Sequence, residues 1–116
     1  MINIKAGRVR GLNRSKEIHD FCKSRRIPVW CGGMLETGIG RAFNVALASL
    51  PGFTLPGDTS ASRRYFKRDI IEKEFELTGD GTLQVPYGPG IGVEVDQELL
   101  DSYTTHKELF TIDQIR

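Results

Sequence analysis

The chain has 116 residues, 39% of them hydrophobic and 27% charged, which suffices for one domain with a buried core. Its 16 basic and 15 acidic residues leave a formal net charge of +1. This near balance argues against a protein that binds polyanions nonspecifically, because such proteins carry an excess of basic residues. No apolar run approaches the ~20 residues of a membrane span, and the N-terminus lacks the apolar core of a secretory signal. Cys22 and Cys31 are too few for a disulfide scaffold, so we expect a cytoplasmic protein with reduced thiols.

The first 25 residues predict a strand followed by a helix. Residues 2–5 alternate in polarity, which favours a short strand, and a glycine-containing loop follows. Asn13 is a plausible N-cap for a helix over residues 14–25. The apolar positions of that helix repeat at i, i+3 and i+4, at Ile18, Phe21 and Cys22.

Residues 28–55 repeat this alternation of short apolar runs and helical patterns. Residues 28–31 are bounded by proline and by two glycines, which predicts a buried strand. Thr37 can cap a second helix that ends before Pro51-Gly52, and residues 53–55 predict a third strand. Strand, helix, strand, helix, strand in about 55 residues indicates βαβ units and a parallel sheet.

The composition changes after Asp58, and we place a boundary there between segments 1–58 and 59–116. Residues 74–85 alternate on both sides of a turn at 78–81, which predicts a β-hairpin. Asp96 can cap a short helix that carries Leu99, Leu100 and Tyr103, and the tail from Thr104 is expected to be peripheral.

The candidate site residues lie where the first two predicted strands end. Lys5 ends the first strand, at the sheet edge where parallel α/β folds bind ligands. A lysine there can act as a base, or it can be a solvated loop residue. Gly32 and Gly33 can bring backbone close to a ligand beside Met34 and Leu35, or simply form a turn between strand and helix.

The remaining motifs are weaker. Asp58 can face this site or cap residues 59–62, and we favour the cap. His19 and His106 lack partners at metal-ligand spacing, so we expect no metal ligands in this chain. The basic residues 63–68 include two aromatics, but a solvated edge is the commoner meaning of so short a run, and we expect no nucleic-acid partner.

Three segments resemble a known family. NIKAGRVRGL, IPVWCGGMLETGIGRAFNVALASLPGFTLPGDTSAS and VPYGPGIGVEVD are similar to the C-terminal end of the o-succinylbenzoate synthases and N-acylamino acid racemases, in the muconate-lactonizing-like branch of the enolase superfamily. The resemblance runs from about Ile2 to Tyr103. It implies an α/β fold: the last three strands (six to eight) of a (β/α)7β TIM-like barrel, followed by a C-terminal β-hairpin and helix of the capping domain.

The resemblance also implies a mechanism. Lys5 stands where the family has the second of two lysines that face each other across the α-carbon of a small carboxylate substrate, with Mg²⁺ stabilising the ene-diolate. In the synthases, which dehydrate their substrate in menaquinone biosynthesis, that lysine is thought to steady the intermediate by a cation–π contact. Gly32, Gly33, Met34 and Leu35 match the substrate-binding lip, and Glu36 lies where relatives place an acid near the substrate carboxylate.

Part of the family's machinery does not match any residue of this chain. The first lysine and the three metal carboxylates belong to strands that would precede Met1. We therefore expect the 116-residue chain to be inactive alone, with Mg²⁺ bound only by a full-length parent. We expect it to form a homo-oligomer or to associate with the missing N-terminal part. The alternative is a non-catalytic small α/β module that self-associates or binds a partner, and the preference between dehydration and racemisation stays open.

Overall fold

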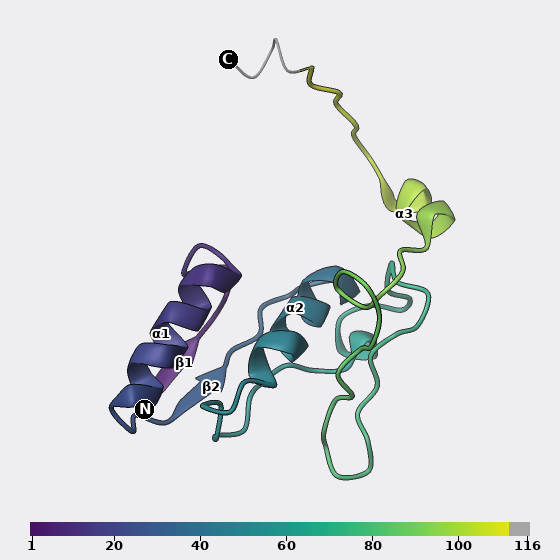
Figure 1. The fold of residues 1–116 in the computed structure, drawn as a ribbon. Helices are drawn as coiled ribbons and strands as arrows, with labels where there is room; N and C mark the ends of the chain where they lie inside the picture. The colour runs from purple at the N-terminus through teal and green to yellow at the C-terminus, as the bar shows by residue number, and fades with distance from the viewer. Residues whose placement is uncertain (112–116) are drawn as a thin grey trace.

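The computed structural model describes residues 1–111. In chain order the elements are strand β1 (Ile2–Ile4), helix α1 (Leu12–Ser24), strand β2 (Val29–Cys31), helix α2 (Gly38–Ala48), the 3-10 turn η1 (Ser62–Arg64) and helix α3 (Gln97–Tyr103). Figure 1 shows α1, β1 and β2 at one end, α2 in the middle, and the segment after α3 running away from the body. Within this part of the chain, no helix has the length and apolar character that a bilayer crossing requires.

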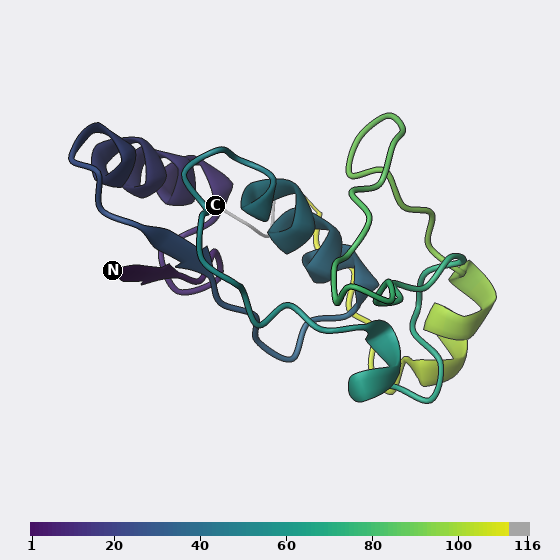
Figure 2. The same cartoon turned by 90° about the horizontal axis from the view of Figure 1, so that it is seen from below.

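The two strands form the parallel pair that the alternating pattern predicts. Ile2 pairs with Val29 and Ile4 with Cys31. Ile4, Val29 and Cys31 are buried in one apolar cluster with Cys22 of α1 and Leu47 of α2, so both helices cover the same side of the pair. Figure 2 shows α1 lying along that side. Because side chains alternate along a strand, the opposite side carries Asn3, which is exposed, and Trp30, which is half-buried.

The predicted third strand over residues 53–55 is wrong as a regular strand, although its direction is right. Phe53 makes a single parallel bridge to Val29, and the Leu55 N–H donates to the Val29 carbonyl at 3.4 Å. The Thr54 N–H turns back to the Gly52 carbonyl at 3.0 Å, and Pro56 has no N–H to donate. The segment therefore runs beside β2 without continuing its ladder.

Helix α1 begins two residues earlier than predicted and buries a different set of side chains. Gly11, with φ of 95°, occupies the N-cap, so Asn13 is not the cap. The fully buried positions are Ser15, His19 and Cys22, whereas Phe21 is 55% exposed. The apolar repeat predicted the helix correctly but missed two polar residues on its buried side.

His19 explains why a polar side chain can be buried there. Its Nε2 accepts the Gly52 N–H at 2.9 Å, its Nδ1 lies 2.8 Å from Asp20 Oδ1, and its ring stacks on Phe53 with 5.4 Å between centroids. Both ring nitrogens therefore have partners. These contacts hold the loop after α2 against α1.

Helix α2 is capped by a residue far along the chain. Thr37 stands at the N-cap as predicted, but its side chain makes no capping hydrogen bond. Instead the Gly38 N–H donates to Asp69 Oδ1 at 2.7 Å. Asp69 is fully buried, and its Oδ2 lies 3.3 Å from Arg41 Nη1 and accepts the Ser62 hydroxyl at 2.6 Å. This buried network joins α2 to residues 62–69.

Residues 59–96 wrap α2 with little regular structure. A second apolar cluster joins Ala42 and Val45 of α2 to Ile71 and Phe75. The predicted hairpin over residues 74–85 is reduced to its turn and one antiparallel bridge, Leu77 with Leu83, so its two strands are wrong.

The end of the described chain matches its prediction. Asp96 caps α3 by accepting the Leu99 N–H at 2.9 Å. Residues 104–111 are exposed, and residues 112–116 of the predicted second segment lie outside the described part. The division into segments 1–58 and 59–116 stays a prediction.

Candidate functional site

Lys5 and the two glycines after β2 meet at one edge of the parallel pair. Lys5 directly follows β1, and the Gly32 N–H donates to the Ile4 carbonyl at 3.0 Å, which extends the ladder past the ends of both strands. The half-buried Lys5 side chain donates from Nζ to the Gly33 carbonyl at 2.5 Å. Its cationic end is therefore held at the Gly32–Gly33 loop.

Gly32 leaves room for this arrangement. A Cβ at residue 32 would overlap the Asn3 side chain and lie 2.8 Å from Lys5 Cγ. Real Cβ atoms do not approach other atoms this closely. The side chains of Asn3 and Lys5 therefore lie directly over the backbone of residue 32, and a Cβ there would force them to shift.

Two carboxylates hold the loop that follows. The Gly33 N–H donates to Asp58 Oδ1, and the Met34 N–H donates to Glu36 Oε1 and Oε2 at 2.9 and 2.7 Å. The preference for Asp58 as a cap of residues 59–62 is wrong. Its own N–H donates to the Cys31 carbonyl at 3.2 Å, which places its side chain at the rim of the site.

Asn44 is a site residue that the sequence analysis missed. Its Nδ2 donates to Glu36 Oε1 at 2.8 Å, although Asn44 is 3% exposed and lies in α2. The signal was a polar residue within the predicted helix, three positions before the apolar Leu47 and on the same side of the helix. Its partner lies eight positions earlier in a loop, where helical periodicity does not reach.

The apolar lip expected beside the glycines lines an open cleft of about 790 Å³. Met34 and Leu35 are 43% and 75% exposed, and they share the lining with Leu12, Phe43 and Arg10. The loops after β1 and β2 both contribute walls. Lys5 is not itself in the lining, but its ammonium contacts the Gly33 carbonyl, directly before Met34.

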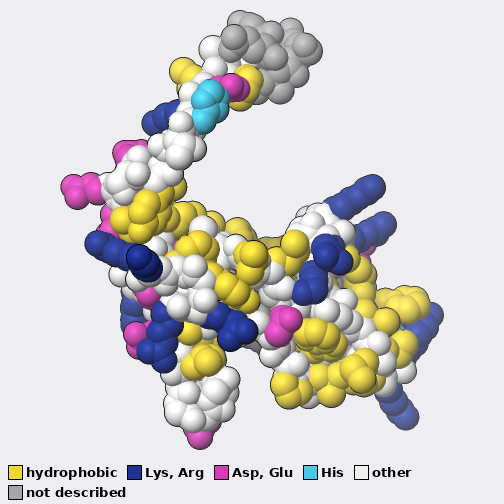
Figure 3. Space-filling model, turned by 180° about the vertical axis from the view of Figure 1, so that it is seen from behind, with side chains coloured by type: hydrophobic (Ala, Val, Ile, Leu, Met, Phe, Trp, Pro, Cys, Tyr) yellow, Lys and Arg dark blue, Asp and Glu magenta, His cyan; other side chains and the backbone are white. Residues whose placement is uncertain are grey.

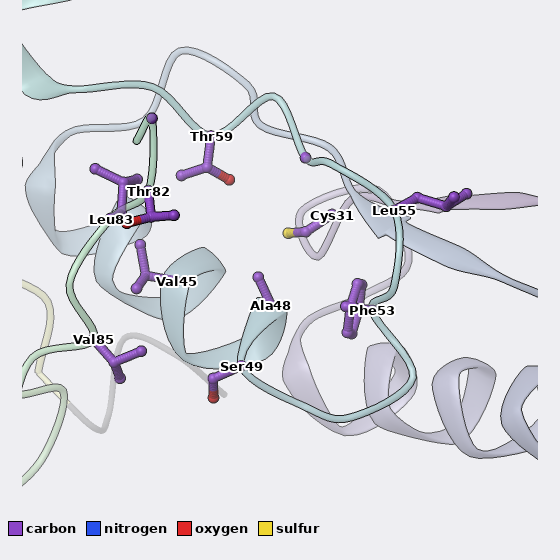
Figure 4. A pocket seen from close by; sticks show the side chains of 12 residues that line it. Cys31, Val45, Ala48, Ser49, Phe53, Leu55, Thr59, Thr82, Leu83 and Val85 are labelled. Atoms are coloured by element: carbon purple, nitrogen blue, oxygen red, sulfur yellow. The ribbon is translucent and has the colours of Figure 1, made fainter. Parts of the chain in front are cut away.

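The Cys31 thiol lies behind the site and is not poised as a nucleophile. Burial raises its pKa to about 11, and the charges of Glu36 and Asp58 add to that rise, while the nearby Thr59 hydroxyl and the charge of Lys5 oppose it. Figure 4 shows Cys31 beside a second, mostly apolar hollow of about 320 Å³, which Thr59 also enters. At neutral pH the sulfur is an uncharged thiol.

The residues present do not fit a magnesium site. Among residues 1–111, no three His, Cys, Asp or Glu side chains gather closely enough to hold a metal ion. Magnesium needs oxygen ligands free to coordinate it. Near Lys5 the two carboxylates are those of Glu36 and Asp58, and each already accepts backbone N–H groups.

The model of the enolase C-terminal domain-like family matches residues 1–99. The chain belongs to this family. An N-succinylamino acid racemase from an Amycolatopsis species is 62% identical over 107 residues, which cover 92% of this chain and 28% of the relative. An o-succinylbenzoate synthase from Geobacillus stearothermophilus is 54% identical over 110 residues, or 95% of this chain and 29% of the relative.

Solved structures of the enolase superfamily share the fold. A member from Listeria innocua superposes with a TM-score of 0.86 at 48% identity, covering 90% of this chain and 28% of the other. The resemblance to o-succinylbenzoate synthases and N-succinylamino acid racemases is therefore confirmed. This enolase-superfamily chain is a small α/β unit that spans less than a third of the length of these relatives.

Proposed function

We propose that the chain supplies one catalytic lysine and part of the substrate rim of an o-succinylbenzoate synthase or N-succinylamino acid racemase. The observation that carries the proposal is the Lys5 side chain, which turns from the end of β1 to the Gly33 carbonyl, 2.5 Å away. High identity to proteins with both names supports the choice of reaction class. In this proposal β1 and β2 are strands six and seven of a (β/α)7β barrel, and residues 53–55, which run beside β2 without forming a regular strand, follow at its next position.

In this proposal Lys5 exchanges a proton with the carbon next to the substrate carboxylate. The neutral amine takes the α-proton with its lone pair, and the C–H electron pair stays on the substrate. The resulting ammonium donates to the Gly33 carbonyl, the acceptor that it contacts in the structure. Return of a proton to the opposite side of the carbon gives racemisation. In dehydration the family's other lysine takes the α-proton and returns it to the neighbouring hydroxyl, which leaves as water, while the Lys5 ammonium steadies the intermediate.

The apolar cleft suits the unreactive part of such a substrate. Met34 and Leu35 expose apolar surface beside Lys5, and burying methylene groups there contributes about 0.8 kcal/mol each. Because the described residues do not fit a magnesium site, dependence on a divalent metal is a prediction for the full-length protein.

The test places this chain in a complete enzyme. The 107 residues that align with the Amycolatopsis racemase replace the matching segment of that enzyme, and dehydration and racemisation are both assayed. We expect Lys5→Ala to abolish racemisation and to lower the dehydration kcat by about 10²–10⁴-fold with an unchanged Tm. Lys67→Ala, at an exposed lysine, is the matched control. Activity of the Lys5 variant near that of the control contradicts the assignment.

A further inference from the structure

We propose that Glu36 is a positioning residue for Lys5, acting through the Gly33–Met34 peptide and not through the substrate. The proposal deepens the function proposed above and rests on it. It replaces the expectation that Glu36 lies beside the substrate carboxylate.

A single peptide group links the two side chains. The carbonyl of Gly33 accepts Lys5 Nζ at 2.5 Å, and the N–H of the same peptide, on Met34, donates to both carboxylate oxygens of Glu36. A peptide group is planar, so its C=O and N–H point in opposite directions. Holding the N–H therefore fixes the direction of the carbonyl that receives Lys5.

This peptide needs such a hold because Gly33 has no side chain to restrict it. Glycine has wide freedom in φ and ψ, so the plane after Gly33 can rotate at little cost unless both ends are bound. The Gly33 N–H is bound by Asp58, on one side of the residue. Glu36 binds the next N–H, on the other side.

Glu36 is itself anchored in the interior of α2. Asn44 donates to its Oε1 at 2.8 Å, and Arg41 Nη2 donates to its main-chain carbonyl at 3.2 Å. Asn44 and Arg41 are 3% and 1% exposed, and Arg41 is held by Asp69. A continuous set of contacts therefore runs from the buried network of α2 to the Lys5 ammonium.

Glu36 lines the cleft proposed for the substrate, but its carboxylate oxygens are engaged by the loop and by α2. Oε1 of Glu36 accepts from both Asn44 and Met34, and Oε2 accepts from Met34. A carboxylate with these partners would repel a substrate carboxylate placed beside it. Its charge is directed at the loop.

The experiment compares two substitutions in the chimera described above. Glu36→Ala removes every side-chain contact, whereas Glu36→Gln keeps an Oε1 that can accept from both Met34 and Asn44. We expect Glu36→Ala to lower kcat by about 10²-fold, the cost of a misplaced catalytic group, with KM changed less than about threefold. Glu36→Gln should recover activity to within about tenfold of the unsubstituted chimera.

A second readout separates misplacement of Lys5 from general damage. Exchange of the α-proton in D2O is followed separately for the two enantiomers of an N-succinylamino acid. Lys5 lies on one side of the α-carbon, so Glu36→Ala should slow exchange of one enantiomer at least tenfold more than the other. Asn44→Ala should give the same asymmetry at smaller size, and Glu17→Ala, on the exposed side of α1, should leave both rates unchanged.

The outcomes distinguish this proposal from the proposed function. If the unsubstituted chimera exchanges the α-proton of neither enantiomer, the proposed function is wrong, and so is the role of Glu36 that rests on it. If the chimera exchanges both but Glu36→Ala changes neither rate, slows both equally, or only raises KM, the positioning role alone is wrong. A Glu36→Gln variant as slow as Glu36→Ala overturns it too, because charge would then matter more than the geometry of the acceptor.

Discussion

At the scale of single residues, the site depends on positions that have almost no side chain. Gly32 allows Asn3 and Lys5 to lie over the backbone of the next strand's loop, and Gly33 lets the following peptide turn its carbonyl to Lys5. The polar groups that hold this loop come from Asp58 and Glu36. The position of the Lys5 side chain is determined by space as much as by charge.

A methyl group at Gly32 should therefore displace Lys5. We expect Gly32→Ala in the chimera to lower kcat/KM by about 10²-fold, because its Cβ would lie 2.8 Å from Lys5 Cγ. Gly79→Ala is the control, since a Cβ there meets nothing within 4 Å. Steady-state kinetics on both variants decides, and equal values for the two would show that Lys5 does not need this space.

The Cys31 thiol should resist alkylation. Thiolate is the reactive form, and burial raises the pKa of Cys31 to about 11, so the thiol stays protonated below that pH. With Cys22→Ala leaving Cys31 as the single cysteine of the segment from this chain, we expect iodoacetamide at pH 8 to label Cys31 in the folded chimera at least 100-fold more slowly than in the urea-unfolded protein, as followed by mass spectrometry of the peptide that contains it. Rapid labelling of the folded protein would mean that Cys31 is accessible and ionised.

At the scale of elements, the first two helices and the parallel pairing of the strands could be predicted. The contacts between distant segments could not. Local periodicity and turn residues indicate α1, β2 and α2 because these signals lie within the elements. The third strand failed because the Thr54 N–H turns back to Gly52 and Pro56 cannot donate, so a run of apolar residues was not enough.

The candidate site could likewise be predicted only where its residues lie at the ends of predicted strands. Lys5, Gly32 and Gly33 were found because they end predicted strands at one edge of a sheet. Asn44 and the rim position of Asp58 were not, since their bonds to Glu36 and Gly33 cross eight and 25 positions of sequence. Such pairs depend on how elements pack, which no local pattern encodes.

The buried pair of Arg41 and Asp69 should dominate the stability of α2. Removing one partner leaves a buried charge unpaired, which typically costs 3–5 kcal/mol. We expect Asp69→Ala to lower the unfolding free energy of the chimera by about that amount, measured by urea denaturation, because Asp69 also accepts the Gly38 N–H. Glu76→Ala, at an exposed carboxylate, should change it by less than about 0.5 kcal/mol. A loss no larger than this control would show that the pair is dispensable.

At the scale of the whole molecule, one side of the parallel strand pair is left uncovered. The side of the β1–β2 pair opposite its helices is covered by no other element of the described chain, and Figure 3 shows hydrophobic side chains at the surface on the rear of that end. Asn3 on this side is exposed, and Met34 and Leu35, in the loop after β2, are both more than 40% exposed. We expect this surface to associate with further polypeptide, either the rest of a full-length enzyme or a second copy.

The isolated chain should neither turn over substrate nor bind magnesium. We expect no measurable dehydration or racemisation, and no heat on titration with MgCl2, because residues 1–111 contain no cluster of three metal-ligating side chains. Sedimentation should show the same mass with and without Mg²⁺, above that of a monomer. A compact monomer would favour the alternative of an independent non-catalytic module, and Mg²⁺-dependent activity of the chain alone would contradict the proposed division of the machinery.

The distant cap of α2 has a consequence for any attempt to divide this polypeptide in two. When residue 48 has left the ribosome, all of α2 has been synthesised. The N–H of Gly38 nevertheless has no carboxylate to donate to until Asp69 emerges, 31 positions later. A chain break between Arg41 and Asp69 would leave the Arg41 guanidinium buried in one fragment without its carboxylate partner. Reassembly from two expressed fragments should therefore be less efficient when the break falls between Arg41 and Asp69 than when it falls before Glu36, or beyond Val95, where the bridge to Ile71 has closed the wrapping segment.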